Sequence, residues 1–485
     1  MKAWGSEISE GDSFARSWRD ECGVFGVWNH PQASRLSYLG LFAIQHRGQE
    51  STGIVALDGQ AHHIKKGLGL VADVFDEQTL NALPGTSAIG HVRYSTTGMN
   101  SLNNAQPLTA HLFNGPVAVA HNGNIVNAEP LKQELREQGS IFQGSNDTEI
   151  ILHMIARNPS SDLLQCLKGA LERLEGAYSL TVLSHKALFA ARDPMGFRPL
   201  VLGQLEEKFN DRPTYVVASE TCAFDLIGAR FVREIEPGEI FWVDETGEHS
   251  IFLEKKRSTS RCVFEHVYFA RPDSVVFGES VYEVRKRAGQ ILARETAVDI
   301  DMVIPVPDSG VPAAIGYANE SGKPFELGII RNHYIGRTFI QPQQSIRDFG
   351  VKIKLNPQMA VLKGKRVVVV DDSLVRGTTS RKIVGLVRSA GAKEVHLRIA
   401  APPTRSPCYY GVDTPEKSQL IAANQSLESI RQFVGADTLG YLSLNGLKSA
   451  VRGESGGYCS ACFDGKYPTE LFGLDAKPKG NIRGI

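Results

Sequence analysis

Residues 366–380 read RVVVVDDSLVRGTTS, and their pattern predicts a strand, a loop and a helix in that order. The four valines from Val367 to Val370 are typical of a strand that is buried on both faces of a parallel sheet. Asp371 and Asp372 follow where this strand should end, and an apolar run with helical spacing begins after Ser380. The sequence therefore predicts an α/β unit with an acidic pair at the end of its strand.

The loop of this unit has the residues of a phosphate-binding turn. Free N–H groups at the start of a helix receive phosphate, and hydroxyl side chains add donors at the same place. The candidate residues are Arg376, Gly377, Thr378, Thr379 and Ser380. Asp371 and Asp372 are candidates for holding ribose hydroxyls or Mg²⁺, which favours oxygen ligands. The alternative is an ordinary strand–turn–helix unit without a ligand.

Bulk composition limits the possible functions of the chain. Its 485 residues predict two or three domains, and its 53 basic and 53 acidic residues give no charge excess that favours nucleic acid or a membrane surface. No apolar run is long enough to span a membrane. Residues 1–21 lack the apolar core of a secretory signal, so we expect a propeptide leader and a cytoplasmic protein. Seven cysteines without an export signal favour core packing, metal binding or catalysis over disulfides.

The pattern of apolar runs changes near the middle of the chain. Residues 22–250 show many short strand-like runs broken by Gly, Asn and Asp, which predicts an α+β domain. Residues 260–450 alternate strands with helices, which predicts an α/β domain with a parallel sheet. The strand candidates there are Met302–Pro305, Glu326–Ile330, Arg366–Val370 and Glu394–Ile399. Residues 451–485 form a tail that carries two cysteines.

Cys22 lies in the motif ECGVFG, directly after the polar leader. If the leader is cut before it, the Cys22 thiol lies beside its own α-amino group, whose pKa near ~8 lets it act as a base. Such a thiolate can attack a carboxamide and release ammonia. A buried strand cysteine is the alternative interpretation.

Three further motifs place polar groups at the ends of apolar runs. Arg93 in HVRYSTT can grip a carboxylate with two hydrogen bonds, and Asp147 in SNDTE can hold an α-ammonium group. In AHNGN, the side-chain amide of Asn122 and the backbone N–H of Gly123 can donate to a tetrahedral oxyanion. Each motif alone is also compatible with a turn or a surface ion pair.

The C-terminal half carries two more candidate features. Ser309, in the strand-end loop IPVPDSG, is a candidate ligand of a cation or a pyrophosphate. The long segment Arg331–Lys354 is rich in Arg, Lys, Gln and Tyr and has little periodicity, as the lid of an active site often does. A plain proline-bounded turn and a solvated surface loop are the respective alternatives.

Four cysteines outside the N-terminal half are candidate metal ligands. They are Cys262, Cys408, Cys459 and Cys462. The Cys-x-x-Cys spacing of the last two places two thiolates on one metal, but spacing cannot show that all four meet. Thiolate sites accept zinc or iron–sulfur alike. Cys166 and Cys222 lie in apolar patterns and are expected in the core.

Taken in order, these motifs resemble known families. The stretch 366–380 resembles the phosphoribosyl-pyrophosphate (PRPP) motif of type I phosphoribosyltransferases. CGVFG, QHRGQES and the polar motifs above resemble an N-terminal-nucleophile (Ntn) glutaminase with an αββα sandwich. Both halves together resemble the leader-processed, iron–sulfur subclass of glutamine PRPP amidotransferases, from Cys22 to Cys462.

The resemblance implies an enzyme of de novo purine synthesis that makes 5-phosphoribosylamine, pyrophosphate and glutamate from glutamine, PRPP and water. It implies Cys22 as nucleophile, Asn122 and Gly123 as oxyanion hole, and Arg93 and Asp147 as glutamine clamp. It further implies one Mg²⁺ per subunit at Ser309, Asp371 and Asp372, and a [4Fe–4S] cluster on the four cysteines. A homotetramer and inhibition by purine nucleotides are also implied. The rival functions are a PRPP-binding regulator and another Ntn amidotransferase.

Overall fold

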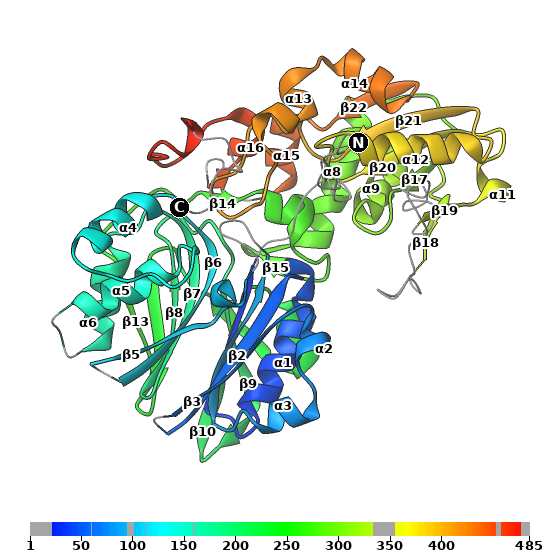
Figure 1. The fold of residues 1–485 in the computed structure, drawn as a ribbon. Helices are drawn as coiled ribbons and strands as arrows, with labels where there is room; N and C mark the ends of the chain where they lie inside the picture. Colours follow the sequence, from blue (N-terminus) through cyan, green and yellow to red (C-terminus); the bar gives the residue numbers. More distant parts are fainter. Residues whose placement is uncertain are drawn as a thin grey trace, which may run out of the picture.

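The computed structural model describes residues 22–59, 61–94, 101–113, 115–158, 160, 162–332, 355–452 and 457–476. The expected leader and residues 333–354, the greater part of the expected lid, lie outside this described part of the chain. Figure 1 shows two bodies joined side by side, one of stacked sheets and one with a smaller sheet among helices.

The first sheet of the N-terminal half has seven antiparallel strands. Their order is β11 (Arg230–Glu234), β9 (Val201–Phe209), β10 (Arg212–Ala218), β1 (Gly23–Trp28), β4 (Ser87–Arg93), β2 (Ser51–Asp58) and β3 (Ala61–Leu68). Apolar side chains of the helices α1 (Ala33–Ala43), α2 (Val71–Val74), α3 (Glu77–Asn81) and α7 (Cys222–Ile227) share one buried cluster with β1, β2, β4 and β10. These helices therefore cover the outer face of the sheet.

The second sheet has six antiparallel strands. Their order is β13 (Gly247–Phe252), β12 (Glu239–Asp244), β8 (Ala187–Arg192), β7 (Gly176–Ser184), β6 (Gly115–Ile125) and β5 (Leu108–Leu112). The helices α4 (Ala128–Glu137), α5 (Glu149–Arg157) and α6 (Leu163–Leu171) pack on its outer face. A separate buried cluster joins the two sheets and includes Val24, Ile89, Ala118 and Leu183. The expected αββα sandwich is therefore confirmed.

The C-terminal half is built on a parallel sheet, as the sequence predicts. Its order is β17 (Met302–Pro305), β20 (Arg366–Asp371), β21 (Glu394–Ile399) and β22 (Thr438–Tyr441). Helix α8 (Val281–Glu295) packs on α9 (Val311–Ser321), while α12 (Thr378–Ser389) packs on α14 (Leu427–Val434). Helix α9 leads from β17 to Phe325, which bridges to β17 on the side away from β20, whereas α12 leads from β20 to β21 in the opposite direction across the sheet. Right-handed crossovers in opposite directions place the two helix pairs on opposite faces. Helix α15 (Leu444–Ala450) adds to the α8 side.

The strand predicted at Glu326–Ile330 does not join the parallel sheet as an extended partner. Phe325 makes a single parallel bridge to Val303, and the chain then leaves the sheet. The strand β18 (Ile329–Arg331) pairs antiparallel with β19 (Leu355–Pro357) instead. Residues 332–354 connect these two short strands. The apolar run Glu326–Ile330 therefore leads into the β18–β19 pair and does not form a strand of the parallel sheet.

Short elements join the two halves. After β13 the chain crosses at residues 253–260 and enters β14 (Arg261–Cys262) and a π-helical turn at Glu265–Phe269. The tail returns to this junction, where β23 (Tyr458–Cys459) pairs parallel with β14 and is followed by α16 (Ala461–Asp464). The remaining short elements are β15 (Val275–Val276), β16 (Glu279–Ser280), α11 (Met359–Leu362), α13 (Ile421–Asn424), and 3-10 turns at Gln45–Arg47, Leu102–Asn104, Lys417–Gln419 and Leu474–Ala476.

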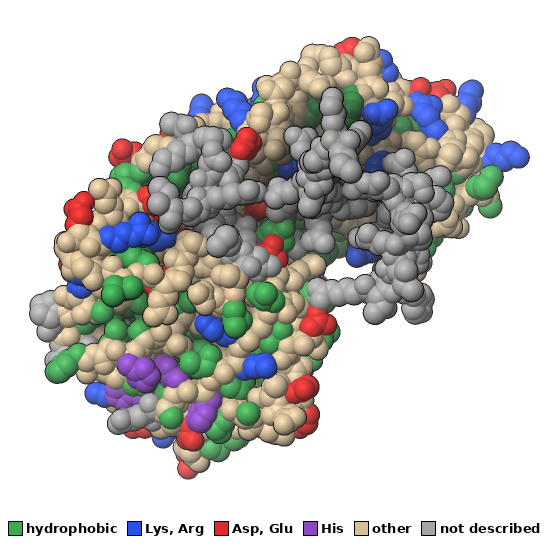
Figure 2. All heavy atoms as spheres, viewed as in Figure 1, with side chains coloured by type: hydrophobic (Ala, Val, Ile, Leu, Met, Phe, Trp, Pro, Cys, Tyr) green, Lys and Arg blue, Asp and Glu red, His purple; other side chains and the backbone are tan. Residues whose placement is uncertain are grey.

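The surface carries mixed charge. On the face in Figure 2, basic and acidic side chains are interspersed, in keeping with the balanced composition. Among the described residues, no helix has both the length and the apolar character needed to cross a membrane.

Candidate functional site

Cys22 lies just before β1, at the edge of the first sheet where β4 ends. Gly23 is paired with Val92, so the antiparallel register extended by one residue places Cys22 beside Arg93. The Cys22 thiol donates a hydrogen bond to the carbonyl of Tyr94 at 3.5 Å, and the residue is buried. The backbone of two strands thus fixes the candidate nucleophile next to the candidate carboxylate-binding arginine.

Asn122 and Gly123 come from β6, in the facing sheet. The Asn122 side-chain amide approaches the hydroxyl of Ser219 at 3.5 Å, and the same hydroxyl accepts from the N–H of Val24 at 3.0 Å. Ser219 therefore connects the candidate oxyanion donors to the start of β1, two residues from Cys22. Gly123 has φ of 150°, and a Cβ there would lie 2.1 Å from the carbonyl of Ala177, so a larger residue cannot take its place.

Asp147 lies beside the same strand. Its carboxylate accepts a hydrogen bond from the backbone N–H of Ile125 at 2.8 Å and lies 3.7 Å from the ring of His121. Burial opposes ionisation of Asp147, but His121 and the Ile125 N–H outweigh it and lower the pKa of this carboxyl group. An ionised carboxylate in this place suits an α-ammonium group, so both members of the predicted glutamine clamp are buried at this end of the sandwich.

The acidic pair and Ser309 meet at the carboxyl ends of two neighbouring parallel strands. The Ser309 hydroxyl donates to Asp372, and Ser373 donates to the other oxygen of Asp372 at 2.5 Å. Burial and the adjacent Asp372 raise the pKa of Asp371 well above its usual value. Two carboxylates and a hydroxyl form an oxygen-rich group of the kind that Mg²⁺ favours, and a cation there would relieve the repulsion.

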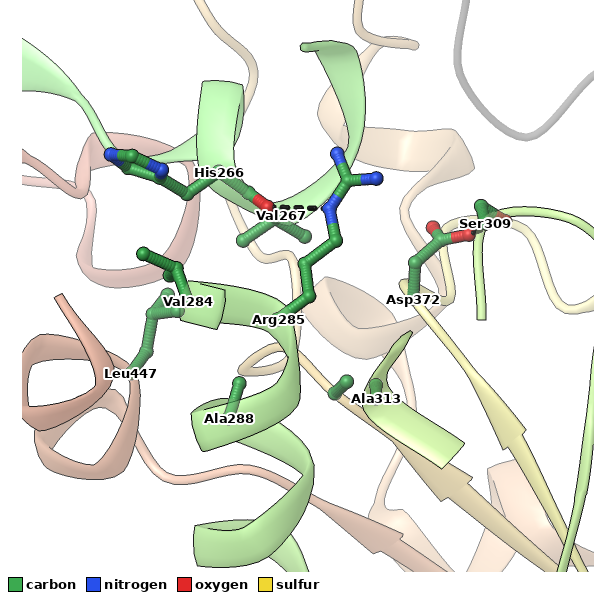
Figure 3. Close-up of a pocket in the computed structure, with 10 residues that line it drawn as sticks. His266, Val267, Val284, Arg285, Ala288, Ser309, Ala313, Asp372 and Leu447 are labelled. Carbon is green, nitrogen blue, oxygen red and sulfur yellow. Dashed lines mark hydrogen bonds between the residues drawn. The ribbon is translucent and has the colours of Figure 1, made fainter. Parts of the chain in front are cut away.

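A small cavity opens beside this group, with Arg285 on its wall (Figure 3). Arg285 donates to the carbonyl of His266 at 2.7 Å and to the carbonyl of Ala270 at 2.8 Å. Burial lowers the pKa of Arg285 to about 10, while the charge of Asp372 acts in the opposite direction. A buried guanidinium thus faces the acidic pair from α8.

The predicted phosphate loop has the expected form. Gly377 is the residue before α12, with φ of 75°, and α12 begins at Thr378. A Cβ on Gly377 would meet the side chains of Ile421 and Phe433 at 3.1 Å, so glycine also serves close packing there. Ser380 is buried in the first turn of α12, and the Arg376 guanidinium bonds to Gln419 at 2.5 Å. The first turn of a helix of 12 residues therefore begins at Thr378, after a short loop that follows the acidic pair, as an anion site requires.

The four candidate cysteine ligands line one cavity at the junction between the halves. Its lining consists of Phe197, Cys262, Phe264, Cys408, Tyr410, Val412, Cys459, Ala461 and Cys462. Cys262 and Cys459 are direct partners in the β14–β23 pair. Burial, with the other cysteines adding to it, raises the pKa of Cys462 well above its usual value. The spacing in the sequence could not show whether the four cysteines meet, and the structure shows that they line one cavity. Cys166 and Cys222 are buried elsewhere in the core, as predicted.

Comparison with known proteins identifies the family. A glutamine amidotransferase domain model matches residues 91–225, and a phosphoribosyl transferase domain model matches residues 278–419. A chloroplastic amidophosphoribosyltransferase of Glycine max is 54% identical over 95% of this chain and 80% of its own length. The amidophosphoribosyltransferase of Bacillus subtilis is 49% identical over 93% of this chain and 95% of its own. This chain belongs to the amidophosphoribosyltransferase family.

A solved structure supports the same conclusion. The glutamine PRPP amidotransferase from B. subtilis, complexed with ADP and GMP, matches with a TM-score of 0.88 and 48% identity, over 94% of this chain and all of that one. As an amidophosphoribosyltransferase, the chain is a glutamine-dependent pentosyltransferase. It makes 5-phosphoribosylamine, pyrophosphate and glutamate from glutamine, PRPP and water, the first step of de novo purine synthesis.

In this amidophosphoribosyltransferase the two halves also meet through buried ion pairs. Arg47 donates to Glu220 at 2.6 Å and to Glu265 at 2.7 Å, and its Nε donates to the carbonyl of Cys22 at 3.1 Å. Arg198 donates to Glu265 at 3.2 Å. These four side chains have no exposed surface. Arg47 therefore joins the backbone of the candidate nucleophile to the first turn of the C-terminal half.

Sequence reasoning missed the roles of Arg47, Ser219, Glu265 and Arg285. Arg47 lies within the QHRGQES stretch, where an arginine among small and polar residues was a usable signal. Glu265 stands in the apolar context CVFEHVYF, and a charged residue inside such a run indicates a buried partner. Ser219 and Arg285 gave no such signal, because each stands among polar or charged neighbours, in ASETC and EVRKR.

Proposed function

We propose that Cys22 performs glutamine hydrolysis and that the acidic pair with the loop 376–380 binds PRPP. The observation that carries the proposal is the placement of Cys22, directly before β1, opposite Asn122 and Gly123 on β6, with Ser219 connecting the two strands. The nucleophile comes from the first sheet and the two oxyanion donors come from the facing sheet. Backbone hydrogen bonds within each sheet hold these groups in place, as acyl transfer requires.

In the first step, the Cys22 sulfur attacks the side-chain carbonyl carbon of glutamine. The thiol proton passes to the α-amine of Cys22, which is free once residues 1–21 are removed, and from there to the departing ammonia. Asn122 and Gly123 donate to the oxyanion, while Arg93 and Asp147 hold the substrate's α-carboxylate and α-ammonium groups. Water then cleaves the thioester and releases glutamate.

In the second step, ammonia forms a bond to C1 of PRPP as the bond from C1 to the pyrophosphate oxygen breaks. The first-turn N–H groups of α12 and the hydroxyls of Thr378, Thr379 and Ser380 bind the 5-phosphate. Ser309, Asp371 and Asp372 would hold one Mg²⁺. When bound, Mg²⁺ supplies neutralisation of the charge that develops on pyrophosphate.

We further propose an iron–sulfur cluster at Cys262, Cys408, Cys459 and Cys462. Four thiols line a single cavity. The resemblance of the motifs to the iron–sulfur subclass favours a cluster over one zinc ion. A bound cluster would cross-link β14, residue 408 and the tail.

The test of the two-site mechanism is the variant Cys22→Ala. It should lose glutamine-dependent release of pyrophosphate from PRPP and keep the ammonia-dependent reaction, because the acceptor site is unchanged. Loss of both activities in a folded variant would contradict the division into two sites. Intact-mass analysis of active protein should show that the mature chain begins at Cys22.

Three broader properties remain predictions. We propose that purine nucleotides inhibit this enzyme, supported by the ADP and GMP in the B. subtilis structure. A homotetramer and a cytoplasmic location are the expectations from the sequence, although the plant relatives are named chloroplastic. Gel filtration with light scattering and localisation of the full-length chain test them.

A further inference from the structure

One cysteine of the shared cavity lies on a segment that also touches the glutaminase half. We call Cys408, Tyr409, Tyr410 and Gly411 the 408–411 segment. The backbone N–H of Tyr410 donates to the Cys408 sulfur at 3.3 Å. The Tyr410 ring stacks on Phe197, which lines the same cavity, at a centroid distance of 4.2 Å. The position of the Cys408 sulfur is therefore mechanically tied to the backbone that follows it.

The next two carbonyls of the segment accept hydrogen bonds from the N-terminal half. The Asn124 side-chain amide donates to the carbonyl of Tyr409 at 2.8 Å, and Asn124 is buried on β6. The guanidinium of Arg198 donates twice to the carbonyl of Tyr410, at 2.9 and 2.8 Å. Because Asn124 and Arg198 bind backbone carbonyls of the 408–411 segment, a shift of that backbone would move both side chains.

The last residue of the segment lies against the proposed oxyanion hole itself. Gly411 has φ of 105°, and a Cβ built on it would lie 3.0 Å from the Cα and the carbonyl carbon of Gly123. The Asn124 side chain follows Gly123 directly on β6. The 408–411 segment thus contacts two consecutive residues of β6, Gly123 through Gly411 and Asn124 through the Tyr409 carbonyl. The same part of β6 is also paired with β7.

We propose that the 408–411 segment positions the oxyanion donors for glutamine hydrolysis, with Gly411 and Asn124 as positioning residues and the metal group at Cys408 helping to fix them. This inference rests on the proposed role of Asn122 and Gly123. Oxyanion donors lie about 2.7–3.1 Å from the developing oxyanion, and the stabilisation falls when they are displaced from that position, so a small displacement of β6 slows the reaction without changing substrate contacts.

The test compares two glycine variants. Gly411→Ala adds a methyl group against Gly123 at a left-handed position. Gly435→Ala is the matched control, because Gly435 also has positive φ (78°) but has nothing within 4 Å of its added Cβ. We expect Gly411→Ala to lower kcat for glutamine hydrolysis about ten-fold with little change in KM, less than the ~100- to 1,000-fold loss of an oxyanion donor. Ammonia-dependent synthesis should stay at the level of the control.

A binding measurement separates positioning from general damage. The aldehyde analogue of glutamine adds the Cys22 thiol to form a thiohemiacetal, whose oxygen occupies the oxyanion hole, whereas glutamate makes only the clamp contacts. Gly411→Ala and Asn124→Ala should weaken the aldehyde about ten-fold and leave glutamate binding unchanged. Equal weakening of both ligands, or of neither, would overturn the inference.

Asn122→Ala distinguishes this failure from failure of the proposed function. If Asn122→Ala does not weaken binding of the aldehyde, the oxyanion assignment is wrong. If it does and Gly411→Ala does not, only the positioning role is wrong.

Removal of iron by chelation tests the contribution of the metal group at Cys408. Amide hydrogen exchange of residues 121–125 should become faster in the metal-depleted wild-type enzyme, and unchanged exchange there would contradict the contribution of the Cys408 site.

Discussion

Asp371 and Asp372 are neighbouring acids, and both are buried where β20 ends. Buried carboxyl groups without full compensation cost stability, and such sites are retained where a ligand needs the charge. Ser309 lies 63 residues earlier in the chain and still bonds to Asp372, because β17 and β20 are adjacent parallel strands that end at the same edge. The sequence placed these residues in two strand-end loops, and the resemblance to the glutamine PRPP amidotransferases implied that they form one site.

Asp372→Asn should weaken use of PRPP with either glutamine or ammonia as nitrogen donor. Loss of one charge-assisted contact costs about 1.5–3 kcal/mol, or ~10- to 150-fold in kcat/KM for PRPP. Asp371→Asn should act in the same direction and, in the absence of magnesium, raise the melting temperature, because it removes repulsion between two buried acids. Steady-state kinetics and thermal melts measure both effects.

The control for these variants is Asp225→Asn on the exposed side of α7. It should change neither quantity. Unaltered PRPP kinetics in both acidic-pair variants would assign the pair a role outside PRPP binding.

At the scale of elements, runs with strong periodicity were predicted well and short ones were not. The four consecutive valines and the helix after Gly377 predicted β20 and α12 with small errors at the ends. Strand β22 (Thr438–Tyr441) was missed, since four residues that include a glycine carry no strand signal. Glu326–Ile330 was assigned to the wrong sheet, because a short apolar run does not specify its partner.

The β14–β23 pair is an element that sequence could not predict at all. Two residues from each strand, almost 200 positions apart, bring Cys262 and Cys459 together. Pairings of this length depend on the complete fold and not on local pattern.

Cys462→Ser should abolish copurification of iron and sulfide and lower the melting temperature. Four thiols held as neutral groups around a cavity add little cohesion, whereas a bound cluster would tie β14 and the tail together. Cys166→Ser is the control, since Cys166 is also a free cysteine but is buried on α6 in the N-terminal half, away from the shared cavity. Metal analysis of anaerobically purified wild-type protein distinguishes iron from zinc at this site. Stoichiometric zinc would show that the four cysteines bind a metal but that the assignment of an iron–sulfur cluster is wrong.

At the scale of the whole molecule, a continuous set of contacts joins the two active sites. Arg285 faces the acidic pair and donates to the carbonyl of His266. The adjacent Glu265 pairs with Arg47, which donates to the carbonyl of Cys22. Burial opposes ionisation in this network, yet His46 and Arg47 hold the pKa of Glu220 well below its usual value, so the network is charged. Charged side chains between 67 and 218 residues apart in sequence thus form one electrostatic unit.

This arrangement predicts that PRPP controls glutamine hydrolysis. Ammonia that escapes to water becomes protonated and is lost as a nucleophile, so hydrolysis without PRPP wastes glutamine. A magnesium–PRPP complex at the acidic pair changes the charge that Arg285 faces, and the change reaches Cys22 through Glu265 and Arg47. Closure of the segment 331–354, predicted as a lid, can add to the effect, although 333–354 lie outside the described residues.

The decisive variant is Glu265→Gln, which keeps the shape of the side chain and removes its charge. Glutamate release by the wild-type enzyme should rise on addition of a non-reactive PRPP analogue, and Glu265→Gln should lose most of that rise while its basal rate changes less. Breaking a buried pair costs ~3–5 kcal/mol, so circular dichroism must first show that the variant is folded. Glu254→Gln is the control: its carboxylate pairs with Lys168 on the surface, 81% exposed, where neutralisation has little effect. If the folded Glu265→Gln enzyme responds to the analogue as fully as the control does, the buried ion pairs hold the halves together without carrying the signal, and control of hydrolysis must reach Cys22 by another route.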